Sequence, residues 1–149
     1  MEPPSGFSPH KLQLPLARTS WAWLIERISF VADEDAISVD LIEMLPETSQ
    51  FEQRRLRLEI ERIIAFRALD EGTMTHYWHA RDTEGVDPST SVYTIASSPF
   101  LEEVRANYFF SSDDNPLVHV LLAGTTTCLE LIGDNYTQFR LSNDVEPLK

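Results

Sequence analysis

Three residues near the end of the chain have side chains that could do chemistry together. Segments 117–123 and 126–132 are rich in apolar residues and flank Gly124-Thr125, which predicts a β-hairpin with those two residues at the bend. In such a hairpin His119 faces Glu130 across the ladder, and Cys128 lies on the same face. A thiol, an imidazole and a carboxylate are the parts of a cysteine nucleophile with its base and its orienting acid.

A structural interpretation of the same residues competes with catalysis. His119 and Cys128 would be diagonal neighbours, with backbones roughly 7–8 Å apart. No glycine-rich turn or helix start adjoins Cys128 to provide an oxyanion hole or to lower the pKa of the thiol. We therefore assign no catalytic residue and keep His119, Cys128 and Glu130 as candidates only.

Metal and cofactor motifs give no stronger indication. His76 and His79 lie three apart in a segment that we predict to be a strand, so their side chains would point to opposite faces. Asp113-Asp114-Asn115 lacks the glycine and terminal glutamate of a calcium loop. The sequence contains no phosphate-binding glycine loop, dinucleotide fingerprint, HExxH, CxxC or GxSxG pattern. We expect no metal and no cofactor.

Charge indicates the kind of partner. The chain has 24 acidic against 12 basic residues, a formal charge of -12, which argues against binding to nucleic acid or to an anionic membrane. Between residues 33 and 47 acidic residues occur with no basic residue among them, which indicates either a docking surface for a basic protein or a solvated sheet edge. The expected partner-binding residues are Asp33, Glu34, Asp35, Asp40, Glu43 and Glu47, with Trp21 and Trp23 as apolar anchors.

The hydrophobic pattern predicts the elements that position these residues. Leu56, Leu58 and Ile60 alternate with charged residues over 55–61 and indicate a strand, whereas the three-to-four-residue spacing that follows predicts a helix over about 61–71. Segments 21–31 and 37–45 should pair as a hairpin, and the first is apolar on both faces, as in a central strand. Further strands are predicted at 75–82, 91–96 and 138–141, and a helix beginning after Ser98 as N-cap.

These elements give the order βββ-α-ββ-α-ββ and an α+β fold, a mostly antiparallel sheet with two short helices packed on it. We predict one domain over residues 20–142. Residues 1–19 are expected to form a poorly ordered or surface-lying arm that does not build the domain, and residues 143–149 a tail.

Three hypotheses about function follow. The first is a cytoplasmic, non-catalytic acidic module that docks a basic protein, as immunity-type inhibitors do; its single cysteine cannot form an internal disulfide, and no signal peptide or membrane span is apparent. The second is a small-molecule binder or enzyme with a pocket between sheet and helices, lined by Trp78, Tyr93 and His79. The third is a homo-oligomer whose first strand is completed by another copy; the oligomeric state is left open.

Overall fold

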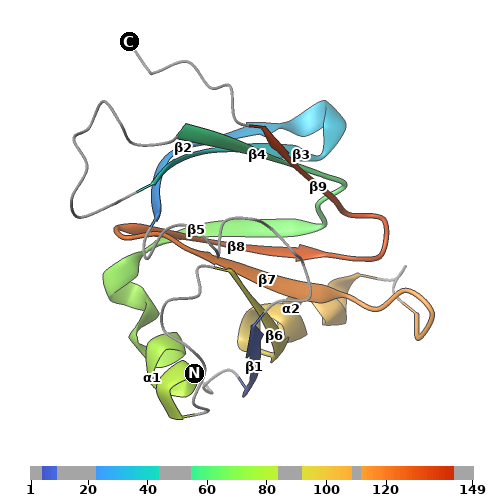
Figure 1. The fold of residues 1–149 in the computed structure, drawn as a ribbon. Helices are drawn as coiled ribbons and strands as arrows, with labels where there is room; N and C mark the ends of the chain where they lie inside the picture. Colours follow the sequence, from blue (N-terminus) through green and yellow to red (C-terminus); the bar gives the residue numbers. More distant parts are fainter. Residues whose placement is uncertain (1–4, 10–22, 44–54, 84–91, 109–111, 143–149) are drawn as a thin grey trace.

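The computed structural model describes residues 5–9, 23–43, 55–83, 92–108 and 112–142, which form two stacked antiparallel sheets (Figure 1). The five-stranded sheet has the order β1-β6-β7-β8-β5 and the four-stranded sheet the order β2-β3-β4-β9. This arrangement confirms the predicted α+β class and its antiparallel pairing. The strands are β1 (Ser5–Pro9), β2 (Trp23–Val31), β3 (Ala36–Glu43), β4 (Arg55–Glu61), β5 (Ala65–Asp70), β6 (Val92–Ser97), β7 (Val118–Ala123), β8 (Thr127–Gly133) and β9 (Gln138–Ser142).

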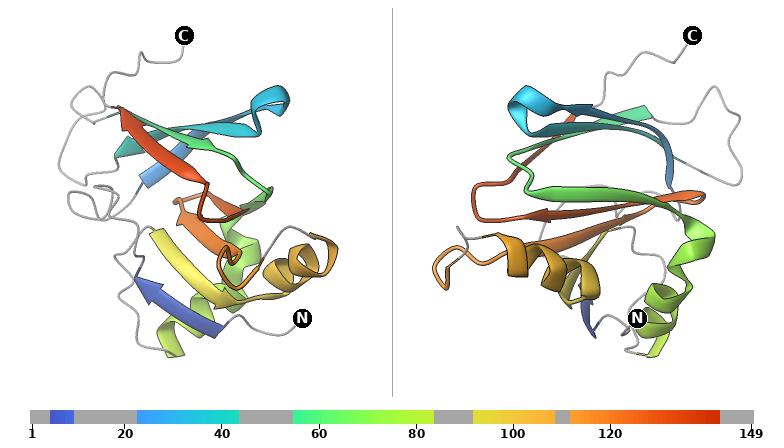
Figure 2. Two further views of the ribbon diagram at one scale, coloured as in Figure 1. Left: turned by 90° about the vertical axis from the view of Figure 1, so that its right-hand side faces the viewer. Right: turned by 180° about the vertical axis from the view of Figure 1, so that it is seen from behind.

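Two helices cover the outer face of the five-stranded sheet, on the side away from the other sheet (Figure 2). They are α1 (Thr75–Thr83) and α2 (Pro99–Asn107). The main apolar core lies between the sheets, where Leu56, Leu58 and Ile60 of β4 join Val120 of β7 and Leu129 of β8. The alternation predicted for 55–61 is confirmed, because these three β4 side chains are buried while their neighbours are only partly so. Smaller apolar clusters lie beneath α1 and α2.

The predicted helix over 61–71 is wrong, because this segment turns a corner and continues as β5. Arg62 adopts a left-handed conformation with φ of 60°. The next two amides anchor the corner: Ile63 N donates to Asp35 O at 3.0 Å and Ile64 N to Ile132 O at 2.9 Å. The chain thereby passes from the four-stranded to the five-stranded sheet. The helix-like spacing of apolar residues arises where the strand alternation loses its phase at this corner.

The strand predicted over 75–82 is also wrong, because residues 75–83 form α1. A short 3₁₀ turn, Glu71–Met74, leads into the helix, and the Asp70 side chain caps this turn by accepting from Gly72 N at 2.8 Å. Met74, Tyr77 and Ala80 then recur every three residues and are all buried against the sheet. Burial of this helical face outweighs the strand preference of the aromatic residues in the segment.

Strand β2 forms the predicted hairpin with β3 but lies at the edge of its sheet, not in the centre. The register shifts between Ile25 and Arg27, so that Ile25 pairs with Leu41 and Arg27 with Asp40. This bulge inserts one extra residue and exchanges the two faces of the strand. Ile28 therefore follows Ile25 on the core side, which explains why the sequence looks apolar on both faces.

The β7–β8 hairpin is confirmed, but its register differs from the predicted one by two residues. Ala123 pairs with Cys128, Leu121 with Glu130 and His119 with Ile132. A shift of two keeps every side chain on its predicted face, since side chains alternate with a period of two. The bend is longer than two residues, and Gly124 N donates to Thr127 O at 3.1 Å across it.

Replacement of Gly124 by alanine should destabilise the fold. A Cβ atom at this position would lie 2.3 Å from the Thr127 carbonyl oxygen, so the backbone of the turn must move. We expect the free energy of unfolding, measured in urea, to fall by about 1–3 kcal/mol. Gly72→Ala is the control and should cost less, because its Cβ would meet only the Asp70 side chain, at 3.0 Å. Equal losses in the two variants would contradict this account of the turn.

Part of the predicted N-terminal arm builds the sheet. Ser5–Pro9 forms β1, which pairs with β6 through contacts such as Ser5 with Ser97 and Phe7 with Ile95. The remainder of the arm and the tail of residues 143–149 lie outside the described residues. The boundaries at residues 19 and 142 stay predictions.

Candidate functional site

A row of polar side chains crosses the outer face of the five-stranded sheet between the two helices. Arg67 of β5 lies opposite Glu130 of β8, and His119 of β7 lies diagonally beyond it. Ser98 follows the end of β6 and caps α2. We call Arg67, Glu130, His119 and Ser98 the polar row. Its members are brought together by strand pairing, although Arg67 and Glu130 are 63 residues apart in the chain.

The polar row is a continuous chain of hydrogen bonds. Leu101 N donates to Ser98 Oγ at 3.0 Å, which is the predicted N-cap bond. Ser98 Oγ lies 2.7 Å from His119 Nδ1, and His119 Nε2 lies 3.0 Å from Glu130 Oε1. Arg67 Nε donates to the other oxygen of the same carboxylate. With the serine hydroxyl donating to Nδ1, the Nε2–H of His119 donates to Glu130, and each group has a partner.

The charge at the centre of the row is buried and compensated. Burial alone would raise the pKa of the Glu130 carboxyl. Hydrogen bonds from His119, Arg67 and Tyr77 have the larger, opposite effect, so the pKa is lowered to about 2. The carboxylate is therefore ionised at neutral pH. Burial also raises the pKa of the Tyr77 hydroxyl, with Glu130 adding to the effect. Only Arg67 reaches solvent, with 32% of its side chain exposed, whereas the side chains of Glu130 and His119 are fully buried.

The structure does not bring Cys128 to His119. Cys128 lies opposite Ala123, four positions along the ladder from the residue opposite His119. Its thiol is fully buried beneath α1, and burial raises its pKa to about 12. A thiol that stays protonated at neutral pH is a poor nucleophile. The predicted common face is correct for all three candidates, but only His119 and Glu130 are in contact.

Ser98 takes the place next to His119 that the sequence analysis considered for Cys128. Ser98, His119 and Glu130 have the order of donors found in a serine hydrolase triad. Ser98 is however only 3% exposed, and its oxygen is held by the helix-capping bond. The following residue, Pro99, has no N–H to stabilise an oxyanion. Ser98 Oγ is therefore buried and already engaged, and the polar row joins α2 to the sheet through Ser98 and His119.

The two histidines of α1 lie on a helix and not on the predicted strand. A helix places His76 and His79 on adjacent turns, so the predicted opposition of the two side chains on a strand does not apply. His76 is half-buried and His79 exposed. Within the described part of the chain, no three His, Cys, Asp or Glu side chains are grouped so that they could hold a metal ion.

The predicted acidic surface is smaller than expected. Asp40 is 4% exposed and accepts a hydrogen bond from Arg57 Nε at 2.8 Å. Trp23 is 2% exposed and belongs to the core between the sheets, so it cannot anchor a partner. Glu43 ends β3, and its side chain is not described; Trp21 and Glu47 lie outside the described residues. Of the acidic residues predicted to bind a partner, those that the structure describes as exposed are Asp33, Glu34 and Asp35.

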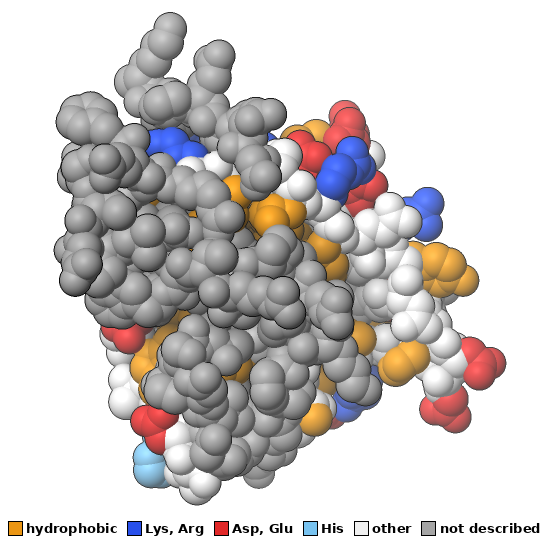
Figure 3. Space-filling model, in the orientation of Figure 1, with side chains coloured by type: hydrophobic (Ala, Val, Ile, Leu, Met, Phe, Trp, Pro, Cys, Tyr) orange, Lys and Arg blue, Asp and Glu red, His pale blue; other side chains and the backbone are white. Residues whose placement is uncertain are grey.

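These three carboxylates sit at the tip of the β2–β3 hairpin beside exposed apolar side chains. Phe30 is 48% and Val31 46% exposed, and both directly precede the 3₁₀ turn Ala32–Glu34. Figure 3 shows acidic and hydrophobic side chains close together at this end of the molecule, with basic side chains nearby. We call Phe30, Val31, Asp33, Glu34 and Asp35 the hairpin-tip surface. The charges of this surface belong to the predicted acidic segment, whereas its apolar part differs from the prediction, because the sequence pattern places Phe30 within a central strand.

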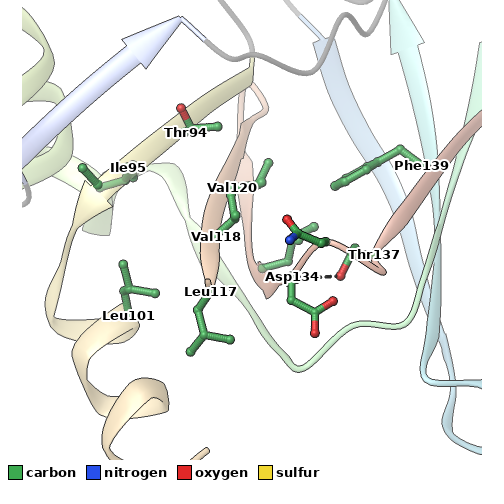
Figure 4. A pocket seen from close by; sticks show the side chains of 13 residues that line it. Thr94, Ile95, Leu101, Leu117, Val118, Val120, Asp134, Thr137 and Phe139 are labelled. Atoms are coloured by element: carbon green, nitrogen blue, oxygen red, sulfur yellow. Dashed lines mark hydrogen bonds between the residues drawn. The ribbon is translucent and has the colours of Figure 1, made fainter. Parts of the chain in front are cut away.

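A pocket of about 530 Å³ lies where the two sheets separate (Figure 4). Val118 and Val120 of β7 line one side, and the Phe139 ring extends toward them from β9. Trp78, Tyr93 and His79, which we expect to line a pocket between sheet and helices, are not among the described residues that line this pocket, and Tyr93 is fully buried.

Comparisons of this chain with protein-family models, with curated proteins and with solved structures find no match. None of the helices within the described ranges is long and apolar enough to cross a membrane.

Proposed function

We propose that this chain is a non-catalytic module that binds a basic protein through its hairpin-tip surface. The observation that carries the proposal is the exposure of Phe30 and Val31 directly beside three exposed carboxylates. In protein interfaces a few apolar, often aromatic, side chains supply most of the affinity, and charges accelerate and orient the encounter. The hairpin-tip surface offers both kinds of group within six consecutive residues.

The backbone of the tip supports this role because hydrogen bonds and a ring contact connect it to the rest of the domain. Asp35 is left-handed, with φ of 46°, and its N–H donates to Ala32 O. Its own carbonyl accepts from Ile63 N at the corner between β4 and β5. The Phe30 ring contacts the Phe66 ring, with centroids 5.0 Å apart. A partner would therefore meet a surface that is already ordered, which lowers the entropic cost of binding.

The overall charge of -12 favours a basic partner. Immunity-type inhibitors, which cover the basic active site of a toxin, are one class of protein with this chemistry. The buried free thiol of Cys128 is compatible with the reducing cytoplasm, where we place the protein. The buried polar row would contribute to stability and not to a reaction.

Removal of the tip charges should slow association with the partner. The tagged chain is used to capture its partner at low salt from the cells that make the protein, and the recovered pair is studied by surface plasmon resonance. Replacement of Asp33, Glu34 and Asp35 by serine should lower the association rate constant at low salt by about tenfold, because electrostatic attraction is lost. The difference should shrink at 0.5 M salt, where charges beyond a few ångströms are screened.

A matched control distinguishes the effect of the hairpin-tip charges from the effect of a change in the net charge of the chain. Replacement of Glu103, Asp113 and Asp114 by serine also removes three exposed carboxylates, on and after α2 at a distance from the hairpin. This variant should associate at close to the wild-type rate. Equal slowing of both variants, or no slowing of the tip variant, would reject the hairpin-tip surface as the docking site.

A further inference from the structure

The pocket between the sheets has an apolar interior. Among the residues that line it, Val120 and Leu131 are buried, and Val118 and Phe139 are half-buried. Leu101 of α2 and Leu117 extend the apolar lining toward the helix layer (Figure 4). A volume of about 530 Å³ falls within the range of pockets that bind small molecules.

Polar groups at the pocket come mainly from the turn between β8 and β9, and most of their hydrogen-bonding capacity is already used. Thr137 Oγ1 donates to Arg62 O and accepts from Asp134 N. The Asp134 carboxylate accepts from Tyr136 N at 2.8 Å and from Asn115 Nδ2 at 3.2 Å. No lysine, arginine or histidine is among the described residues that line the pocket. These described lining residues therefore offer no positive charge to neutralise an anion.

Charge then decides which kind of ligand fits. Asp134 is the one formally charged residue among the described lining residues, and it is negative. A carboxylate or phosphate brought into this pocket would lose hydration without gaining a counter-charge. Each carboxylate oxygen can accept more than one hydrogen bond, so Asp134 can still accept one from a ligand hydroxyl or amine.

We propose that this pocket binds an uncharged, mostly apolar small molecule, with a single hydrogen-bond donor directed at Asp134. Apolar contact with Val118, Val120 and Phe139 supplies the affinity, and Asp134 excludes anionic molecules of the same shape. This site is separate from the hairpin-tip surface and does not depend on the docking proposal.

Two fluorescent probes with the same ring system test the proposal. 1-Aminoanthracene is uncharged at neutral pH and carries one amine donor, whereas anthracene-1-carboxylate is an anion. We expect 1-aminoanthracene to bind saturably at one site per chain with a dissociation constant in the micromolar range, and the carboxylate to bind at least tenfold more weakly. Non-saturable binding of the amine, or equal affinity for both probes, would overturn the proposal.

Substitutions locate the probe. Val118→Trp places an indole in the pocket from a half-buried position and should weaken binding of 1-aminoanthracene at least tenfold. Ala106→Trp adds the same indole to an exposed position on α2 and should leave binding unchanged. Circular dichroism and thermal unfolding verify that both variants fold. Wild-type affinity in folded Val118→Trp would show that the probe binds elsewhere and reject this pocket.

Asp134→Asn provides a second variant that does not depend on filling the pocket. Asparagine keeps a side-chain oxygen to accept from Tyr136 N within the turn, and loses the acceptor for Asn115 Nδ2, so thermal unfolding is measured to verify that this variant folds. The preference for the amine over the carboxylate should fall at least threefold in this variant. An unchanged preference would show that Asp134 does not select the ligand. The serine variant of Asp33, Glu34 and Asp35 should bind both probes as the wild type does, so failure of one proposal leaves the other intact.

Discussion

Replacement of Glu130 by alanine is expected to lower the free energy of unfolding by about 3–5 kcal/mol, enough to unfold a large part of a marginally stable protein. Glu130 is fully buried and accepts hydrogen bonds from both His119 and Arg67. Its removal leaves the Arg67 guanidinium, about two-thirds buried, without its counter-charge and deprives His119 Nε2 of its acceptor. Both groups would keep the cost of desolvation without the compensating bond.

Urea unfolding at pH 7 measures this effect, and an exposed ion pair provides the comparison. Glu102 pairs with Arg105 on α2, where both side chains are about half exposed. Glu102→Ala should therefore cost no more than about 1 kcal/mol. A loss for Glu130→Ala as small as that for Glu102→Ala would show that the polar row contributes little to stability.

Acid should weaken the fold through the same carboxyl group. The pKa of Glu130 is about 2 in the folded chain, against 4.5 for a glutamate without such partners. A carboxyl whose pKa is lowered by folding stabilises the folded state above its unfolded pKa, and this contribution disappears as the pH falls toward the folded pKa. The difference of about 2.5 pKa units corresponds to about 3 kcal/mol, lost between roughly pH 5 and pH 2.

Comparison with Glu130→Gln isolates this contribution from the titration of other acids. Glutamine has nearly the same shape but does not ionise in this range. The stability difference between wild type and Glu130→Gln, measured by urea unfolding, should be largest at pH 7 and shrink as the pH is lowered. A difference that stays constant from pH 7 to pH 2.5 would mean that Glu130 has an ordinary pKa in the folded chain.

Prediction from the sequence succeeded where the strand alternation was unbroken and failed where it changed phase. The β4 alternation and the N-cap at Ser98 depend on residues close in the chain, and both are confirmed. The bulge after Ile25 and the corner at Arg62 each shift the alternation, and no glycine or proline marks either place. The corner is held by bonds from Ile63 to Asp35 and from Ile64 to Ile132, which are contacts that local spacing does not encode.

In the candidate sites, too, features that depend on neighbouring residues were predicted, whereas contacts between distant segments were not. His119 and Glu130 were predicted on one face, and the two-residue error in register did not alter that face. Arg67 and Tyr77 were missed because the segments that contain them were assigned to the wrong kind of element. Ser98 was recognised as a helix cap, but its second bond, to His119, joins residues 21 positions apart. The apolar half of the hairpin-tip surface was missed because the bulge in β2 was not foreseen.

His119 touches both helices at once. The Tyr77 ring of α1 meets its imidazole edge-on, with centroids 6.2 Å apart, and the Phe100 ring of α2 does so at 5.6 Å. Arg67 of β5 provides a second link, because its guanidinium lies 4.4 Å from the centroid of the Phe100 ring and also interacts with Tyr77. The mutual dependence of the two helices therefore passes through His119 and Arg67 of the sheet. Detachment of either helix would expose the His119 imidazole to water. The packing of the other helix against this imidazole would then be weakened. The helix layer should therefore behave as one cooperative unit, although it is built from two separate segments of the chain.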